Sequence, residues 1–118
     1  MKLLLVDDSA TMRRIQRTQL ANLGITDIEE AGNGEEALAK LAAVPGIEVV
    51  LLDWNMPVMD GYVFLQAARA NGAYKDIKIV MCTSESEKSK VIEALKAGAN
   101  NYIVKPFTPE ALKEKLGI

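Results

Sequence analysis

The chain has 118 residues, 49% of them hydrophobic, which suffices for one globular domain with a sizeable core, and we expect that domain to span residues 1–118. The net charge of −2 gives no electrostatic case for nucleic acid or an anionic membrane as partner, and no apolar stretch approaches the roughly 20 residues that cross a bilayer. Histidine is absent, which excludes a histidine-based triad, histidine-ligated zinc and phosphohistidine within the chain, and the single cysteine, Cys82, indicates a reducing, cytoplasmic location.

Five short strand-like runs along the chain, four of them apolar, predict β-strands. Runs this short and rich in Val, Ile and Leu are typical of strands buried on both faces of a parallel sheet. The predicted strands span residues 2–6, 27–31, 47–52, 78–82 and 101–104.

A helical pattern follows each predicted strand. The first helix is expected to begin near Ser9 and to end at Gly24, because glycine is a common C-terminal stop. The side chains expected to face the core from this helix are Met12, Ile15, Leu20 and Leu23.

The later predicted helices each begin at a capping signal. Asn33 and Asp60 are good N-caps, and Thr108–Pro109 combines a cap with proline at the first helical position. Residues 84–87, Ser-x-x-Glu, have capping-box spacing ahead of an apolar face. That face comprises Val91, Ile92 and Leu95.

The strict alternation of strands and helices predicts an α/β fold, a doubly wound, five-stranded parallel sheet of the flavodoxin-like (βα)5 type. Open sheets of this size commonly adopt the strand order 2-1-3-4-5, which places the first and third strands side by side at the point where the order reverses.

Polar side chains stand at the ends of four predicted strands. Asp7–Asp8, Asp53, Thr83 and Lys105 each come directly after an apolar run. In open α/β sheets the ligand site lies off the carboxyl ends of the strands. We therefore expect these residues to converge on one edge of the sheet.

Three ionised carboxylates brought together repel one another, and this repulsion is relieved if one carboxylate takes up a proton or if a cation binds. Because only oxygen ligands are at hand, the expected ion is Mg²⁺, with Mn²⁺ as the alternative. Asp7 and Asp8 are placed as ion ligands, with Asp8 favoured as the direct one, and the backbone carbonyl of Asn55 would complete the shell beside Asp53.

A magnesium site beside a lysine and a hydroxyl suggests phosphoryl chemistry. Asp53 is the candidate nucleophile, since aspartate can form an acyl phosphate. Lys105 would pair with Asp53 or its phosphoryl group, and Thr83 would donate its hydroxyl to a phosphoryl oxygen. Taken singly, each residue has a simpler interpretation as a helix cap or a solvated loop residue, so the hypothesis rests on their convergence.

Several motifs occur in a characteristic order along essentially the whole chain. They are Leu5–Ser9, Asp53–Pro57 with Asp60–Gly61, Thr83–Ser84, Ala97–Tyr102 and Val104–Phe107. Together they closely resemble the receiver domains of two-component response regulators, so residues 1–118 are expected to form a single receiver domain. Within that family the chain is most similar to stand-alone chemotaxis regulators, which carry the same residue types at Trp54, Asn55, Glu85 and Tyr102.

The resemblance implies a defined cycle. A histidine kinase donates its phosphoryl group to Asp53 in a magnesium-dependent reaction that the receiver itself catalyses. Lys105 and Thr83 hold the phosphoryl oxygens, Thr83 then moves, and Tyr102 swings inward. The acidic metal site implied by the family comprises Asp7, Asp8, Asp53 and the Asn55 carbonyl.

The same resemblance implies partners and a role. The surface formed by the predicted helix that ends before Gly98, strand 101–104 and the final helix would bind the flagellar motor switch protein and control the direction of rotation. The chain would be a cytoplasmic monomer and a signalling phosphoacceptor rather than an enzyme. Lys105–Pro106 is commonly a cis peptide in this family, and the final helix here is short for the chemotaxis type.

Secondary features complete this picture. Glu85 and Asn55 flank the site, and Trp54 is expected to be part-exposed beside the ion. Arg13, Arg14 and Arg17 form a basic stripe, either a solvated face or a docking surface for the kinase or a phosphatase.

Three other functions compete with this one. A single-domain phosphorelay intermediate would pass the phosphoryl group to another histidine protein. A magnesium-dependent phosphatase would need an acid where Asn55 stands, and a flavodoxin-like FMN carrier would need a phosphate-binding loop in place of Asp7–Asp8.

Overall fold

The computed structural model describes residues 1–84 and 89–118. Five parallel strands form one sheet in the order β2-β1-β3-β4-β5, which confirms the predicted fold and strand order. The strands are β1 (Lys2–Val6), β2 (Asp27–Ala31), β3 (Ile47–Asp53), β4 (Lys78–Thr83) and β5 (Asn101–Val104).

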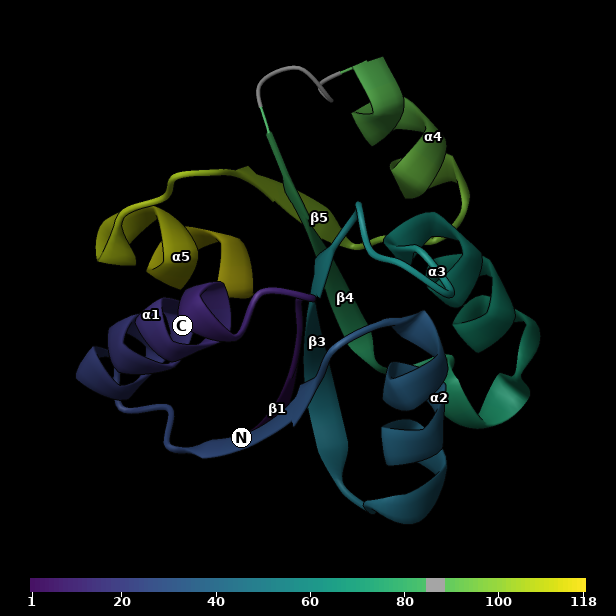
Figure 1. The fold of residues 1–118 in the computed structure, drawn as a ribbon, viewed down its shortest axis with the longest axis horizontal. Helices are drawn as coiled ribbons and strands as arrows, with labels where there is room; N and C mark the ends of the chain where they lie inside the picture. The colour runs from purple at the N-terminus through teal and green to yellow at the C-terminus, as the bar shows by residue number, and fades with distance from the viewer. Residues whose placement is uncertain (85–88) are drawn as a thin grey trace.

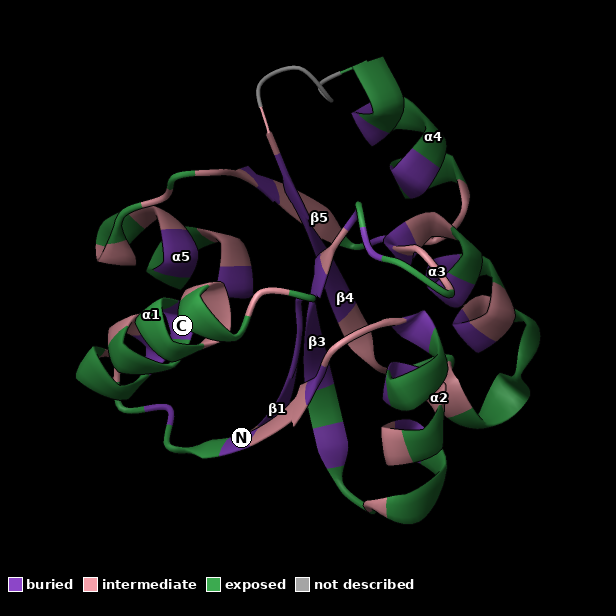
Figure 2. Cartoon of the chain, in the orientation of Figure 1, coloured by how far each residue is buried: buried purple, intermediate pink, exposed green. Residues whose placement is uncertain are grey.

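Helices cover both faces of this sheet, with α1 and α5 on one face and α2, α3 and α4 on the other (Figure 1). The helices are α1 (Ala10–Asn22), α2 (Gly34–Ala43), α3 (Gly61–Ala70), α4 (Val91–Lys96) and α5 (Pro109–Leu116), with a 3₁₀ turn, η1 (Gly72–Tyr74), before β4. Because both faces are covered, β1 and the middle of β3 are almost wholly buried (Figure 2). Over the described ranges, none of the helices has the length and apolar character needed to cross a bilayer.

Four helices start at the residues that the sequence indicates. In each case a side-chain oxygen accepts a hydrogen bond from a backbone N–H of the first turn, which satisfies a donor that the helix leaves unpaired. The pairs are Ser9 with Met12, Asn33 with Glu36, Asp60 with Val63 and Thr108 with Ala111. α4 differs, since it begins at Val91 behind Lys90, which makes no side-chain cap. Glu87 of the predicted capping box lies outside the described residues.

The buried stripes of α1 and α4 differ in detail from the prediction. Ile15 is 48% exposed, and the neighbouring Gln16 is buried in its place. Gln16 and Leu20 lie one turn apart on the face toward the sheet, and Ile15, rotated by about 100°, falls off that face. In α4, likewise, Ile92 and Leu95 are exposed. The core-facing residues of that helix are Val91 and Ala94.

Candidate functional site

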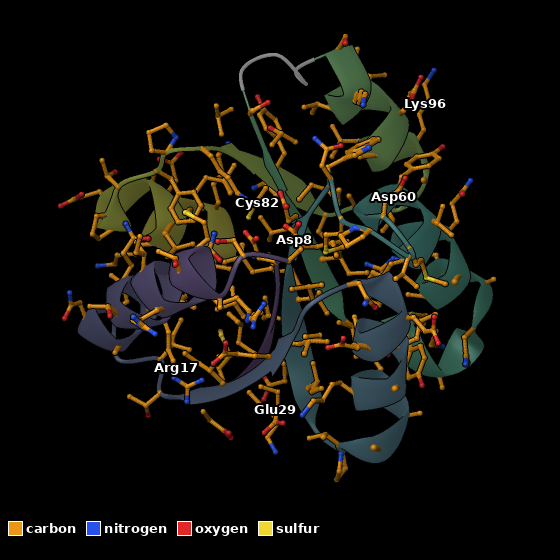
Figure 3. All side chains as sticks on the ribbon, viewed as in Figure 1. Asp8, Arg17, Glu29, Asp60, Cys82 and Lys96 are labelled. Atoms are coloured by element: carbon orange, nitrogen blue, oxygen red, sulfur yellow. The ribbon has the colours of Figure 1, made fainter. Side chains whose placement is uncertain are left out.

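The three aspartates predicted to form the site lie together at the carboxyl edge of the sheet. One carboxylate oxygen from each of Asp7, Asp8 and Asp53 lies within 4.8 Å of the others. The pairing of β1 with β3, in register at Val6 and Leu52, brings the two chain segments together at this point. Figure 3 shows Asp8 where these strand ends meet, between α1 and the loop that leads to α3.

Lys105 enters the same cluster from the far end of the chain. Its Nζ donates to Asp7 Oδ2 and to Asp53 Oδ1, at 2.9 Å each. Its backbone N–H donates to the carbonyl of Thr83 at 2.6 Å, which holds the residue beside the tip of β4. The Lys105–Pro106 peptide is cis. One ammonium thus bridges two of the three carboxylates.

The ionisation of these groups follows from burial and from this pairing. Burial raises the pKa of Asp53 above its ordinary value; the Lys105 ammonium opposes that rise, and the charges of Asp7 and Asp8 add to it. Burial alone would lower the pKa of Lys105, but its hydrogen bonds to Asp7 and Asp53 outweigh that effect and raise it. Lys105 therefore remains a cation. Any further positive charge placed beside Asp53 would stabilise its ionised form.

The donor set fits a hard divalent ion. Both Asp7 oxygens are engaged, one by Lys105 and the other by the Ser9 backbone N–H at 2.9 Å. The Asp8 carboxylate is exposed and, among the described residues, makes no hydrogen bond or ion pair. A hollow of about 370 Å³ lies over it, lined by Asp8, Asn55, Met56, Pro57 and Asp60. Carboxylate and carbonyl oxygens with room for water are the surroundings that Mg²⁺ prefers.

Thr83 and Tyr102 lie on β4 and β5, the two strands that follow β3 in the sheet. Thr83 ends β4 and is fully buried, and its hydroxyl has no hydrogen-bond partner among the described residues. Tyr102 lies opposite Met81 in β5 and is partly buried. The Nζ of Lys115 lies 4.8 Å from the centre of the Tyr102 ring, a cation–π contact between α5 and β5.

The expectation that Trp54 is part-exposed is wrong. Its side chain is only 6% exposed, because the indole stacks on Tyr62 with 5.3 Å between ring centres. Lys90 Nζ lies 5.3 Å from the indole centre and covers it from the start of α4. Glu85, predicted to flank the site, lies outside the described residues.

Sequence reasoning did not foresee one contact at this edge, between Arg13 and the Asp7 carbonyl. The guanidinium of Arg13 donates to the backbone carbonyl of Asp7, and its Nε pairs with Glu30 at 2.9 Å. A basic stripe on a helix gives no signal of this contact, because it depends on how α1 lies against the end of β1.

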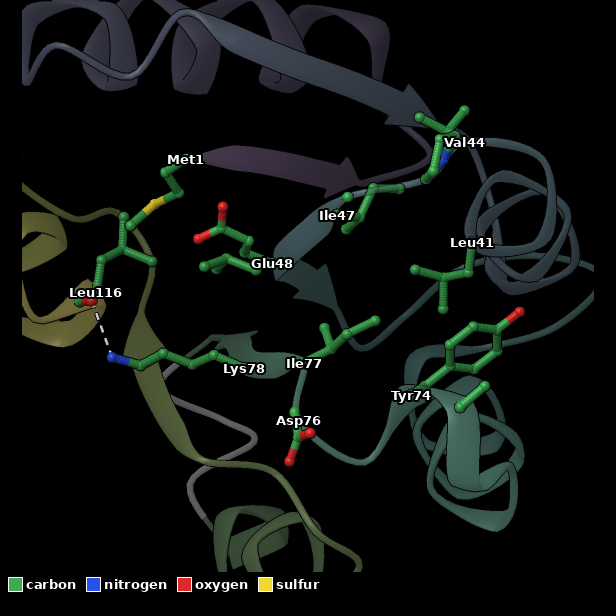
Figure 4. Close-up of a pocket in the computed structure, with 14 residues that line it drawn as sticks. Met1, Leu41, Val44, Ile47, Glu48, Tyr74, Asp76, Ile77, Lys78 and Leu116 are labelled. Atoms are coloured by element: carbon green, nitrogen blue, oxygen red, sulfur yellow. Dashed lines mark hydrogen bonds between the residues drawn. The ribbon is translucent and has the colours of Figure 1, made fainter.

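A larger cavity, of about 580 Å³, lies at the opposite, amino edge of the sheet (Figure 4). The starts of β3 and β4 line it together with the ends of α2 and α5, and Lys78 Nζ donates to the Leu116 carbonyl across it at 2.8 Å. None of the predicted site residues lines this cavity.

The chain is similar to known chemotaxis proteins along its length. It is 54% identical to chemotaxis protein CheY1 of Helicobacter pylori, over all of this chain and 95% of the relative. It is 53% identical to a chemotaxis protein CheY homolog of Campylobacter jejuni, over 98% of this chain and 89% of the relative.

A solved structure and a family model match the chain as well. The solved structure of Vibrio cholerae chemotaxis protein CheY4 matches with a TM-score of 0.88 and 40% identity, over 98% of this chain and 95% of that one. The model of the response regulator receiver domain matches residues 3–117. The chain therefore belongs to the family of response regulator receiver domains.

Proposed function

We propose that this receiver domain accepts a phosphoryl group on Asp53 from a phosphorylated histidine kinase, and that the modified domain binds the flagellar motor switch to control rotation in chemotaxis. The observation that carries this proposal is the convergence of Asp7, Asp8 and Asp53 within 4.8 Å, with Lys105 bonded to the first and the last. Two similar proteins are named as chemotaxis proteins, which supports the flagellar motor switch as the proposed target.

The transfer needs a nucleophile and positive charge that neutralises the transferred phosphoryl group. A carboxylate oxygen of Asp53 forms a bond to phosphorus while the phosphorus–nitrogen bond of the donor breaks, and the imidazole keeps that electron pair. These 118 residues contain no histidine, so the donor histidine lies outside them. Asp8, Asp53 and the Asn55 carbonyl would hold Mg²⁺ beside Asp7, and the ion would neutralise charge on the transferred group.

Lys105 and Thr83 would receive the phosphoryl oxygens. The ammonium already contacts the Asp53 carboxylate, so it is placed to pair with the negatively charged oxygens of a phosphoryl group attached there. The Thr83 hydroxyl is buried without a partner among the described residues, which is costly unless an acceptor arrives. A move of Thr83 toward that acceptor would open space for Tyr102 and so change the surface formed by α4, β5 and α5.

Labelling by a small phosphodonor tests the site. With acetyl phosphate and Mg²⁺, intact-mass spectrometry is expected to find one added phosphoryl group on the wild-type protein and none after chelation or in Asp53→Asn. Asp60→Asn is the matched control, because it also removes a carboxylate that lines the hollow but preserves an N-cap for α3. Labelling of Asp53→Asn at the wild-type rate would refute the assignment.

A binding measurement tests the output separately. A peptide or domain of the flagellar motor switch is expected to bind the phosphorylated protein more tightly than the unmodified one. Equal affinity for both forms would leave Asp53 as a phosphoacceptor but would contradict the role at the motor.

A further inference from the structure

The turn that carries Asp8 is fixed at several points, one of them by α1. The N–H of Asp7 donates to the Ala31 carbonyl at 3.1 Å, and the N–H of Ser9 donates to the Asp7 carboxylate. The carbonyl of Asp7 accepts from the guanidinium of Arg13. Arg13 is thus the side chain that holds this peptide unit from outside the turn.

Arg13 and Arg17 share Glu30 as a partner, but only Arg13 contacts the Asp7–Ser9 turn. Both pair with Glu30, through Oε1 at 2.9 Å and Oε2 at 2.8 Å respectively. Arg17 otherwise reaches the carbonyl of Ile28, at 3.5 Å, and does not contact the Asp7–Ser9 turn. Figure 3 shows Arg17 well separated from Asp8. The Arg13 side chain is 21% exposed and that of Arg17 is 46% exposed, so Arg13 is the more firmly enclosed of the two.

We propose that Arg13 is a positioning residue for the ion site, acting through the Asp7 carbonyl to keep the Asp8 carboxylate turned toward Asp53. This inference rests on the proposed function, in which the cluster holds Mg²⁺. The Asp8 side chain has no hydrogen bond or ion pair among the described residues, so its direction depends on the backbone that carries it. Arg13 fixes the peptide unit that joins Asp7 to Asp8.

Simple electrostatics predicts the opposite effect. A guanidinium near three carboxylates repels a divalent ion, so removal of its charge should tighten Mg²⁺ binding. Loss of a positioning contact should weaken binding, and removal of a residue that orients metal ligands typically costs about 10-fold or more in affinity. The sign of the change therefore distinguishes positioning from charge alone.

The test compares Arg13→Met with Arg17→Met by isothermal titration calorimetry with MgCl₂ at constant ionic strength. Each variant removes one charge and one pairing to Glu30. We expect Arg13→Met to raise the Mg²⁺ Kd about 10-fold. Arg17→Met should leave the Kd unchanged or lower it slightly. An Arg13→Met Kd equal to or below that of Arg17→Met would overturn the proposal.

Two further variants make the result unambiguous. Arg13→Lys keeps the charge but cannot offer a planar fork to both Glu30 and the Asp7 carbonyl, so a Kd between those of wild type and Arg13→Met is expected. If Arg13→Met does not fold, a wild-type Kd in Arg13→Lys would overturn the proposal instead. Asp53→Asn separates the two hypotheses: Mg²⁺ binding that needs Asp53 but not Arg13 refutes only this inference, and binding that needs neither refutes the proposed ion site as well.

Discussion

Val58 has an unusual backbone in the loop between β3 and α3. Its φ is 69°, in the left-handed region that branched side chains rarely adopt. The N–H of Met59 donates to the carbonyl of Pro57 at 2.7 Å, so the three residues form a classic γ-turn, which is strained. The Met59 carbonyl accepts from Gly34 at 2.9 Å and thereby ties this turn to the start of α2.

Val58→Gly is expected to stabilise the protein by about 1 kcal/mol, because glycine adopts positive φ without a steric penalty. The side chain is 77% exposed, so little packing is lost with it. Urea unfolding followed by circular dichroism measures the change. Val58→Ala is the control that removes the branched side chain but keeps a Cβ. A glycine variant no more stable than the alanine variant would contradict the argument from φ.

At the scale of single residues, the sequence predicts which side chains lie together at the strand ends. Asp7, Asp53 and Lys105 could be found because the end of a parallel strand has a fixed place in the fold. The burial of Trp54 could not, because the residue sits in a loop and its surroundings come from Tyr62 and Lys90 on other elements.

Arg69 joins several elements on the α2, α3 and α4 side of the sheet. Its guanidinium extends from α3 and donates four hydrogen bonds of 2.7–2.9 Å. The acceptors are the carbonyls of Tyr74, Ile77 and Gly98 and the side chain of Asn100. Gly98 has φ of +113° and lies so close that a Cβ there would meet Arg69 Cγ at 2.7 Å. The end of α3, η1 and the connection from α4 to β5 are therefore held by one side chain.

Arg69→Met is expected to destabilise the protein by about 2 kcal/mol, because the backbone carbonyls would lose donors that no neighbour replaces. Thermal unfolding by calorimetry measures this loss. Arg14→Met is the matched control, since Arg14 is exposed on α1, and its effect should stay within about 0.5 kcal/mol. Equal losses in the two variants would show that the Arg69 contacts contribute nothing beyond a surface charge.

Predictions at the element scale succeed where the signal is local. The caps at Ser9, Asn33, Asp60 and Thr108 are local, and the structure uses all four. The exposure of Ile15 and the bonds of Arg69 depend on how helices lie against the sheet, and hydrophobic periodicity carries too little information to specify that packing.

Two apolar clusters, one on each face of the sheet, make up the core of the molecule. Cys82 lies in the cluster beneath α1 and α5 and is 1% exposed. Burial raises the pKa of its thiol well above the ordinary value, so the native protein holds it neutral and out of reach of reagents. We therefore expect labelling of Cys82 to report the opening of the whole domain.

A thiol reagent is expected to label Cys82 slowly in the native protein and within seconds in urea. Mg²⁺ at 100 times its Kd should slow native labelling by about 100-fold, because an ion that binds only the folded state stabilises it by about 2.7 kcal/mol. Asp8→Asn is the control in which most of that slowing should vanish. Rapid labelling that ignores Mg²⁺ would mean that a local motion, rather than global unfolding, exposes the thiol.

The bond between Lys105 and Asp7 spans 98 positions of the chain. A ribosome therefore releases all three aspartates well before it adds the lysine that pairs with two of them. Until the last strand is made and docks beside β4, the growing polypeptide has the acidic residues without their counter-charge. The contacts of Lys105 with Asp7 and Asp53 therefore form only at a late stage of biosynthesis, when the last strand is in place.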